Sequence, residues 1–419
     1  MVALSSAVGA DPPGRRVDLP SAGNPMTDEM YERAFQPVPR AIMARRMAER
    51  RRRFRRRFLP LASVSFVFLM LFVSVVGAAS TPGNEGFKAK WADWLRSHHA
   101  AFVVTPIESW YYNRQAPSRG GQPKQLNQVI GAKVTKGPRG DHLPVPAPVA
   151  LVTGNPLPNE GQWVPTGPLV NGLAPMYVAQ FRADDVFTGQ ITSAVWMDPT
   201  LLRLSLIPGS QEPGGTWAES PFITPAQSAT AAAAFNGGFR IQDAHGGFYL
   251  NGQTQGTLQA GASSLVLYAD GHVNVGTWDH EVFMAPDVRA VMQNLVPVVD
   301  NGQAASSATY ADSKIFGSTI GAKTVVARSG VGVTDRGGLV YVAGPALSAR
   351  SLAESLQRAG AVRAMTLDIN PEWVTFNFFQ HDSAGQVGGT KLYPQMQRPA
   401  SRYLGPTHES RDFVMASTP

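Results

Sequence analysis

The 419-residue chain contains no cysteine, which excludes disulfides, thiolate metal sites and a thiol nucleophile. Its length allows one large domain or two, and its 41 glycines and 33 prolines predict many turns. The net charge of +7 lies in residues 1–57, which hold 13 Arg and 6 Asp or Glu. The rest of the chain is balanced in charge, so we expect no nucleic-acid binding by the folded part.

The N-terminal part predicts a membrane anchor. Residues 1–57 are polar and basic, and we expect a disordered cytoplasmic tail that ends in an arginine run. Residues 58–79 follow without a charge, and at about 1.5 Å per residue a helix of this length crosses a bilayer. The arginines mark the cytoplasmic side, which places the rest of the chain outside the cell. A cleaved signal peptide is the alternative, because Gly77-Ala78-Ala79 resembles a cleavage site, but the long leading segment favours an anchor.

Residues 80–174 are expected to hold membrane-proximal helices and a proline-rich linker. Residues 85–96 place Phe87, Trp91 and Trp94 at helical spacing, which suits a helix near lipid headgroups or one packed on the main domain. A second short helix is predicted from Thr105, with Pro106 at its first position. Residues 114–175 contain 11 prolines, which predicts a stiff spacer.

Residues 175–419 read as one α+β domain. Residues 176–182, 191–197 and 201–207 have strand patterns, and hairpin turns are predicted at 251–252, 270–271 and 335–338. Only residues 224–234 and 348–359 read as helices. We therefore expect a mainly antiparallel or mixed sheet with few helices.

The segment from residue 358 to 379 carries the densest chemistry. A helix capped by Ser348 and a buried strand over residues 361–367 lead to Asp368, Asn370 and Glu372. A carboxylate at the end of a packed strand is held rigidly, which suits a functional site, although Asp and Asn also cap turns. The three side chains also resemble the start of a calcium loop but lack its Gly and distal Glu. We expect no cofactor, with calcium as the alternative.

Three other segments are candidates for anion binding. Asn236-Gly237-Gly238 allows backbone N–H groups to approach an anion, and Arg240 follows closely. Arg328 precedes small residues, and its planar guanidinium suits phosphate. A second Gly pair follows His245, for which a structural role is favoured. A plain turn and an ordinary surface arginine are the alternatives for the first two segments.

In order and spacing, these segments resemble the phosphodiester glycosidase family over about residues 175–415. Family members show Asn-Gly-Gly-aromatic after an Ala-rich helix, matched by residues 236–239, and an Arg block before a hairpin, matched loosely by residues 328–332. They then show a strand ending Leu-Asp-Gly-Gly-Gly-Ser, of which Leu367-Asp368 match. Here Ile369-Asn370-Pro371 replaces the glycines, and the chain looks like a membrane-anchored actinobacterial branch.

The resemblance implies hydrolysis of a sugar-1-phosphodiester of the cell envelope at the anomeric carbon. It implies Asp368 as the catalytic carboxylate and Glu372 as a second acid or base. The expected substrate- or phosphate-binding residues are Asn236, Gly237, Gly238, Arg240, Arg328 and Asn370. The alternative is a non-catalytic module that binds an envelope glycopolymer and has lost hydrolase activity along with the glycines. The sequence gives no indication of oligomeric state.

Overall fold

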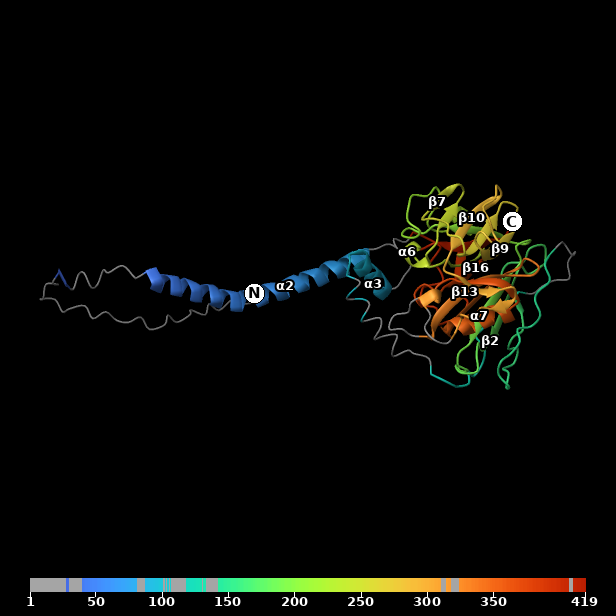
Figure 1. The fold of residues 1–419 in the computed structure, drawn as a ribbon, viewed down its shortest axis with the longest axis horizontal. Coiled ribbons are helices and arrows are strands. Elements are labelled where there is room, and N and C mark those ends of the chain that lie inside the picture. Colours follow the sequence, from blue (N-terminus) through green and yellow to red (C-terminus); the bar gives the residue numbers. More distant parts are fainter. Residues whose placement is uncertain are drawn as a thin grey trace. The chain divides into compact units, whose positions relative to one another are not determined.

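A computed structural model describes residues 28–29, 40–80, 87–100, 102, 104, 106, 118–129, 131–132, 142–309, 314–317, 324–406 and 410–419. The chain divides into two compact units, residues 1–72 and residues 73–419. All of the strands described below belong to the second unit (Figure 1).

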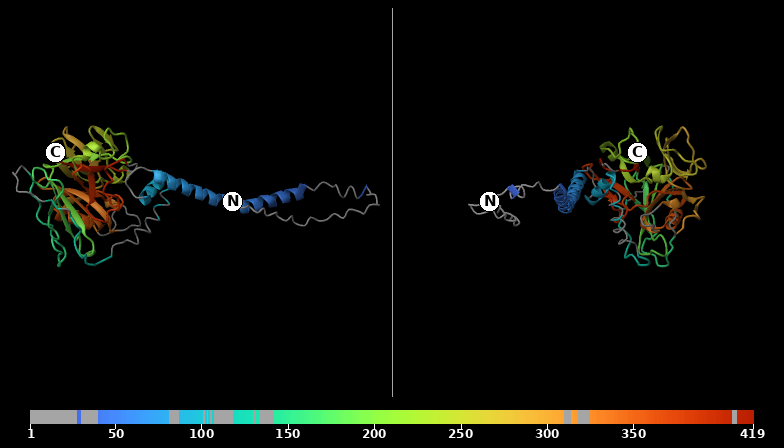
Figure 2. Two further views of the ribbon diagram at one scale, coloured as in Figure 1. Left: turned by 180° about the vertical axis from the view of Figure 1, so that it is seen from behind. Right: turned by 60° about the vertical axis from the view of Figure 1, so that its left-hand side comes forward.

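Helix α2 (Arg40–Ser80) is one continuous helix in Figure 1 and in the left view of Figure 2. Within the described residues it is the one helix long and apolar enough to cross a membrane, over Ala62–Ser80. This agrees with the span predicted at residues 58–79. The expectation of disorder through residue 57 is wrong from Arg40 onward, because the basic run is helical. Arginine is a good helix former, so the run continues the helix of the apolar segment. Residues 1–27 and 30–39 lie outside the described residues.

Helix α3 (Phe87–Ser97) packs against the end of α2 that belongs to the second unit. The Trp91 indole donates a hydrogen bond to Ser74 Oγ at 3.0 Å, and the Trp94 ring covers Gly77 so closely that a Cβ there would lie 2.3 Å from its nitrogen. The aromatic spacing predicted from the sequence therefore serves helix packing. Most of the second helix predicted from Thr105 lies outside the described residues.

Among the described residues, the strands form three sheets in which neighbouring strands are antiparallel, as predicted. The largest has the order β1-β2-β3-β14-β13-β15-β11-β12. Its strands are β1 (Val164–Thr166), β2 (Met176–Phe181), β3 (Thr192–Met197), β14 (Leu339–Leu347), β13 (Val326–Thr334), β15 (Ala361–Thr366), β11 (Pro297–Asp300) and β12 (Gln303–Ala304).

The other two sheets have five strands each among the described residues, in the orders β7-β6-β10-β8-β9 and β17-β16-β5-β18-β4. The first contains β7 (Gln253–Gln255), β6 (Phe248–Leu250), β10 (Val288–Gln293), β8 (Ser263–Tyr268) and β9 (Val273–Thr277). The second contains β17 (Val387–Lys391), β16 (Phe376–His381), β5 (Ala231–Asn236), β18 (Phe413–Ser417) and β4 (Arg203–Ile207). The predicted hairpin turns join β6 to β7, β8 to β9 and β13 to β14.

The main core lies where the three sheets meet, and α7 (Ala349–Arg358) covers the largest sheet (Figure 1). Buried aromatic and aliphatic side chains from all three sheets, such as Tyr341, Met292 and Phe376, share one cluster. Helix α7 begins at Ser348, whose hydroxyl accepts the Ser351 N–H, and buries Leu352 and Leu356 against the sheet. Its amphipathic pattern explains why the sequence predicted it.

The helix predicted over residues 224–234 is wrong for most of its length. Only α5 (Pro225–Ser228) is helical, capped by Thr224, and the alanine run forms the central strand β5. Strands β16 and β18 pair with β5 on either side, and Ala231 to Ala234 are fully buried. The preference of alanine for helix is below about 1 kcal/mol per residue, so pairing on both sides outweighs it.

The expected spacer before residue 175 is in part packed structure. Strand β1 pairs with β2, and the carboxylate of Glu160 pairs with Arg182 at 2.8 Å, both side chains being almost fully buried. Leu143 N–H donates to Asp198 Oδ2 at 2.8 Å. These contacts hold the proline-rich stretch against β2 and the end of β3, so part of it packs on the largest sheet.

Candidate active site

Asp368 stands two residues beyond the end of β15, where the main chain still follows β13. Ser329 N–H donates to the Asp368 carbonyl at 2.8 Å, and Asp368 N–H donates to Ser329 Oγ at 3.2 Å. The side chain of Asp368 is 2% exposed. Because two strands hold its backbone, the carboxylate has a defined position, as the sequence predicted.

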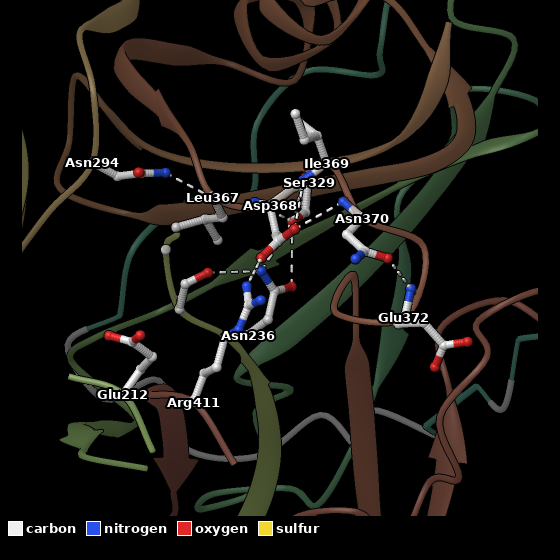
Figure 3. Close-up of polar contacts among 12 residues, drawn as sticks. Glu212, Asn236, Asn294, Ser329, Leu367, Asp368, Ile369, Asn370, Glu372 and Arg411 are labelled. Atoms are coloured by element: carbon white, nitrogen blue, oxygen red, sulfur yellow. Dashed lines mark hydrogen bonds and ion pairs between the residues drawn. The ribbon is translucent and has the colours of Figure 1, made fainter. Parts of the chain in front are cut away.

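The Asp368 carboxylate is held by three donors (Figure 3). Oδ1 accepts the N–H groups of Ile369 at 2.7 Å and Asn370 at 2.8 Å. Oδ2 accepts Nη1 of Arg411 at 2.9 Å. The two N–H bonds come from the turn that follows Asp368, so the turn itself orients the carboxylate toward the arginine.

Burial and charge act in opposite directions on this pair. Burial raises the pKa of Asp368 above its ordinary value, while Arg411, the two N–H donors and Arg240 oppose that rise. Burial also lowers the pKa of the Arg411 guanidinium, which Asp368 opposes. The net direction shows that desolvation outweighs the attraction at Asp368, which is common where carboxyl groups take part in chemistry.

A cavity of about 270 Å³ opens next to this pair. Its polar wall includes Asp368, Asn370, Arg240 and Arg411. The remaining lining residues are Phe239, Asp243, His245, Leu295, Gly317 and Ile369. Two arginines and a carboxylate thus face one cavity with an apolar wall, an arrangement that suits an anionic organic molecule.

His245 has a left-handed backbone (φ 51°) at the end of α6 (Ile241–Ala244).

Asn236 lies at the end of β5 and acts as a structural hub. Its Oδ1 accepts Thr375 N–H at 3.1 Å and the Tyr341 hydroxyl at 3.0 Å. Its Nδ2 donates to Gly237 O at 2.8 Å and to Ser329 Oγ at 3.1 Å. These bonds join β5 to β13 and β14 directly beneath Asp368, so Asn236 supports the carboxylate and does not line the large cavity.

The glycines of this motif are required by close packing. A Cβ on Gly237 would lie 2.0 Å from Asp412 Oδ2, and one on Gly238 would lie 3.2 Å from the Asn294 side chain. Gly237 N–H donates to Asp412 O at 2.9 Å, and Gly238 N–H points to Met292 Sδ at 3.2 Å. Both N–H groups are therefore used within the protein, contrary to the expectation that they face a phosphate.

The structure does not bring Arg328 to the cavity. Its side chain is buried and donates to three main-chain carbonyls, those of Leu347 at 2.9 Å, Phe316 at 3.3 Å and Thr324 at 3.5 Å. A guanidinium with five N–H donors suits this bridging of segments. The sequence pattern could not separate this role from phosphate binding.

Glu372 also lies away from the cavity. Its Oε2 pairs with Nε of Arg398 at 3.0 Å, and its backbone N–H donates to Asn370 Oδ1 at 3.0 Å. Figure 3 shows the Glu372 side chain turned away from Asp368. Since Asp368, Asn370 and Glu372 point to different partners, they do not form the calcium loop considered as an alternative.

Two charged residues of the candidate site that the sequence pattern did not indicate lie near the C-terminus. Arg411 and Asp412 precede β18, which pairs with β5 and so lies beside Asn236. The Arg411 guanidinium also lies 4.1 Å from the centre of the Trp373 ring. In the sequence, these two residues are recognisable only as a charged pair directly before an apolar strand. The order of strands in the sheet places the pair next to Asp368.

Residues 229–368 match the family described as phosphodiester glycosidase. These residues belong to that family. The phosphodiester glycosidase segment runs from just before β5 to Asp368, its last residue, so it includes Asn236, Arg240 and Arg328 and leaves Arg411 and Asp412 outside. No curated protein sequence gives a significant match.

Three solved structures with some similarity each share 14% identity with this chain. One is the catalytic domain of zebrafish N-acetylglucosamine-1-phosphodiester alpha-N-acetylglucosaminidase, auto-inhibited by its pro-peptide. The match covers 58% of this chain and 82% of the zebrafish chain, with a TM-score of 0.37. The match to a hypothetical protein from Synechocystis covers 61% of this chain and 64% of the other chain (TM-score 0.34). The match to a protein from Burkholderia pseudomallei described as exported covers 54% of this chain and 74% of the other chain (TM-score 0.33).

Proposed function

We propose that this protein hydrolyses a sugar-1-phosphodiester at the anomeric carbon. The observation that carries the proposal is the placement of the Asp368 carboxylate, paired with Arg411 at 2.9 Å, in one cavity with Arg240. A phosphodiester carries one negative charge, which two guanidinium groups can bind through charge-assisted hydrogen bonds. The family of residues 229–368 supports the same reaction class.

The reaction breaks the bond between the anomeric carbon and the phosphate oxygen. Water adds to the anomeric carbon, the bond electrons leave with the phosphate, and the products are a free sugar and a phosphomonoester. Asp368 stabilises the positive charge that develops at the anomeric carbon and receives the proton of the attacking water. A phosphomonoester is a weak base, so the leaving group needs cations more than a strong general acid.

In this proposal Arg240 and Arg411 hold the phosphate, and Asn370 contacts the substrate from the turn. All three line the cavity with Asp368. Arg328, Asn236 and the two glycines act by supporting the walls of the site, since their donors are used within the protein. Glu372 has no part in the reaction, because it pairs with Arg398.

The same proposal places the domain outside the cell, anchored by α2, with a cell-envelope glycosyl phosphodiester as substrate. The arginine run before Ala62–Ser80 favours a cytoplasmic N-terminus. Protease added to intact cells should remove an epitope attached after Pro419 and spare one attached before Met1. Protection of the C-terminal epitope would contradict this topology, and loss of both only after lysis would place the whole chain inside.

Turnover of a panel of sugar-1-phosphodiesters by the purified full-length protein tests the activity. We expect release of the free sugar from at least one member and none from an Asp368→Asn variant. Binding of a panel member without turnover would support the non-catalytic glycopolymer-binding alternative. Absence of both binding and turnover across the panel would remove the proposal.

A further inference from the structure

Asp412 is a buried carboxyl group for which the proposed reaction has so far no use. It is the residue before β18, it is 5% exposed, and its Oδ2 has no hydrogen-bond partner among the described residues. The same oxygen lies against Gly237, where an added Cβ would be 2.0 Å away. Ionisation of Asp412 leaves a buried oxygen without a hydrogen bond, which is costly, and backbone hydrogen bonds from Gly238 and Asp412 offset that cost only in part.

Asp412 lies directly behind the wall of the proposed active site. A second, small cavity of about 10 Å³ is lined by Asp412, Asp368 and two guanidinium groups, those of Arg411 and Arg402, together with Gly237, Trp373 and others. Asp368 and Arg411 also line the large cavity, so the Asp368–Arg411 pair separates the two. The small cavity has room for about one water molecule, so Asp412 and Asp368 line one small space beside Arg411.

The charged groups around Asp412 come from several elements. Burial raises the pKa of Asp412 from 3.8 to about 7, the positive charge of Arg411 opposes this, and Glu212 adds to it. Tyr403 on the neighbouring wall has its own pKa raised, chiefly by burial and in part by Asp412. Glu212 and Arg411 lie on the same side of Asp368 in Figure 3, and Glu212 Oε2 accepts Ile241 N–H at 3.2 Å.

We propose that Asp412 is a positioning residue of this site. While Asp412 is a neutral acid, it does not compete for Arg411, so the guanidinium can pair with Asp368 and bind the anionic substrate. When Asp412 ionises, a second carboxylate shares the same guanidinium in a dry environment. The Asp368–Arg411 ion pair then weakens, and the site repels a phosphodiester. The active form therefore combines an ionised Asp368 with a protonated Asp412. This inference rests on the proposed function.

The geometry also assigns a reason to the Asn-Gly-Gly motif. Gly237 is the point at which β5 meets Asp412, through its N–H bond to Asp412 O and through the absence of a Cβ. Any side chain at 237 would clash with both the carboxyl group and the main chain of Asp412. The motif thus links the matched family segment to a C-terminal residue outside it.

The pH dependence of kcat/KM on a sugar-1-phosphodiester is the first test, with the full-length protein. The substrate keeps one charge over the whole range, so changes report the enzyme. In the wild type we expect a loss of about 30-fold between pH 6 and pH 8.5, mainly through a higher KM. In Asp412→Asn the ratio of kcat/KM at pH 6 to kcat/KM at pH 8.5 should fall toward one. In Glu212→Gln the midpoint of the loss should move to lower pH, because a charge that raises the pKa of Asp412 is gone.

A purely structural Asp412 would give a different result. Its replacement would lower kcat/KM by the same factor at both pH values and would leave the wild-type ratio in place. An unchanged midpoint in Glu212→Gln would likewise overturn the assignment.

Thermal unfolding supplies a readout that needs no substrate. The folded-state pKa of Asp412 is raised from 3.8 to about 7, so the stability it contributes is full below about pH 4 and is lost as the pH rises to about 7. The Tm of Asp412→Asn relative to wild type should therefore increase from pH 4 to pH 8. The exposed control Asp335→Asn should show a constant difference. If Asp412→Asn also shows a constant difference, the inference fails, whether or not the protein hydrolyses a phosphodiester.

Discussion

Arg411 donates to Asp368 at 2.9 Å across 43 residues of sequence, and its guanidinium lies 4.1 Å from the centre of the Trp373 ring. The arginine is thus fixed by an anion on one side and an aromatic face on the other. Cation–π contact and charge pairing both strengthen when water is excluded. The pair therefore presents a carboxylate and a guanidinium to the cavity in a fixed relation.

Replacing Asp368 by Asn should abolish most turnover and leave the fold intact. The amide keeps the shape of the side chain but removes the charge that stabilises the anomeric centre, and loss of a general base costs about 10²- to 10⁴-fold in kcat. Asp243→Asn is the matched control, since Asp243 lines the same cavity without contacting Arg411 in the described structure. If Asp368→Asn keeps its turnover with an unchanged melting temperature, Asp368 only caps the turn, because Asn suits such a position as well.

Arg411→Lys should lower kcat/KM for a phosphodiester by about 10- to 150-fold. Lysine keeps the charge, but it cannot bind a carboxylate and a phosphate with a planar fork, and one charge-assisted hydrogen bond contributes about 1.5–3 kcal/mol. Arg240→Lys should have an effect in the same range, because Arg240 lines the same cavity. A neutral aryl glycoside, if it is a substrate, should lose less with Arg240→Lys, since it has no phosphate. Equal losses on both substrates would count against phosphate binding by Arg240.

Arg328→Lys should reduce stability and leave substrate preference unchanged. The guanidinium bridges carbonyls of Leu347, Phe316 and Thr324, and an ammonium group on a different stem cannot reach all three. Unsatisfied buried carbonyls cost about 1–3 kcal/mol each, so the free energy of unfolding measured with urea should fall by a similar amount. Activity on the phosphodiester and on the neutral glycoside should change by the same factor. A selective loss on the phosphodiester would return Arg328 to the phosphate site.

Gly237→Ala should be strongly destabilising. The new methyl group would lie 2.0 Å from Asp412 Oδ2 and 2.6 Å from the Asp412 carbonyl, so main chain as well as side chain would have to move. Overpacking in a core costs about 1–3 kcal/mol, which a chemical unfolding curve resolves. Gly154→Ala is the control, because a Cβ there meets nothing within 4 Å. Equal stability of the two variants would show that Asp412 is not confined by Gly237.

Local sequence patterns predicted those elements whose formation depends on nearby residues. The Ser348 cap with the apolar face of α7, the Asn251-Gly252 and Asp270-Gly271 turns, and the uncharged run within α2 are examples. Asp368 at the end of a buried strand was also predictable, because strand and turn residues adjoin it in sequence. The alanine run of β5 was misread, since alanine favours a helix unless two strands pair with it.

The partners of the candidate site depended on tertiary structure. Pairing of β18 with β5 places Arg411 beside Asp368, whereas Arg328 is turned toward the carbonyls of Leu347, Phe316 and Thr324. An arginine has the same local pattern in either case, because its role depends on which distant acceptors the fold brings within reach. The sequence by itself therefore determined the apolar helix, the antiparallel class and the position of Asp368 at a strand end, and the order of strands in the sheets decided which cations lie next to that carboxylate.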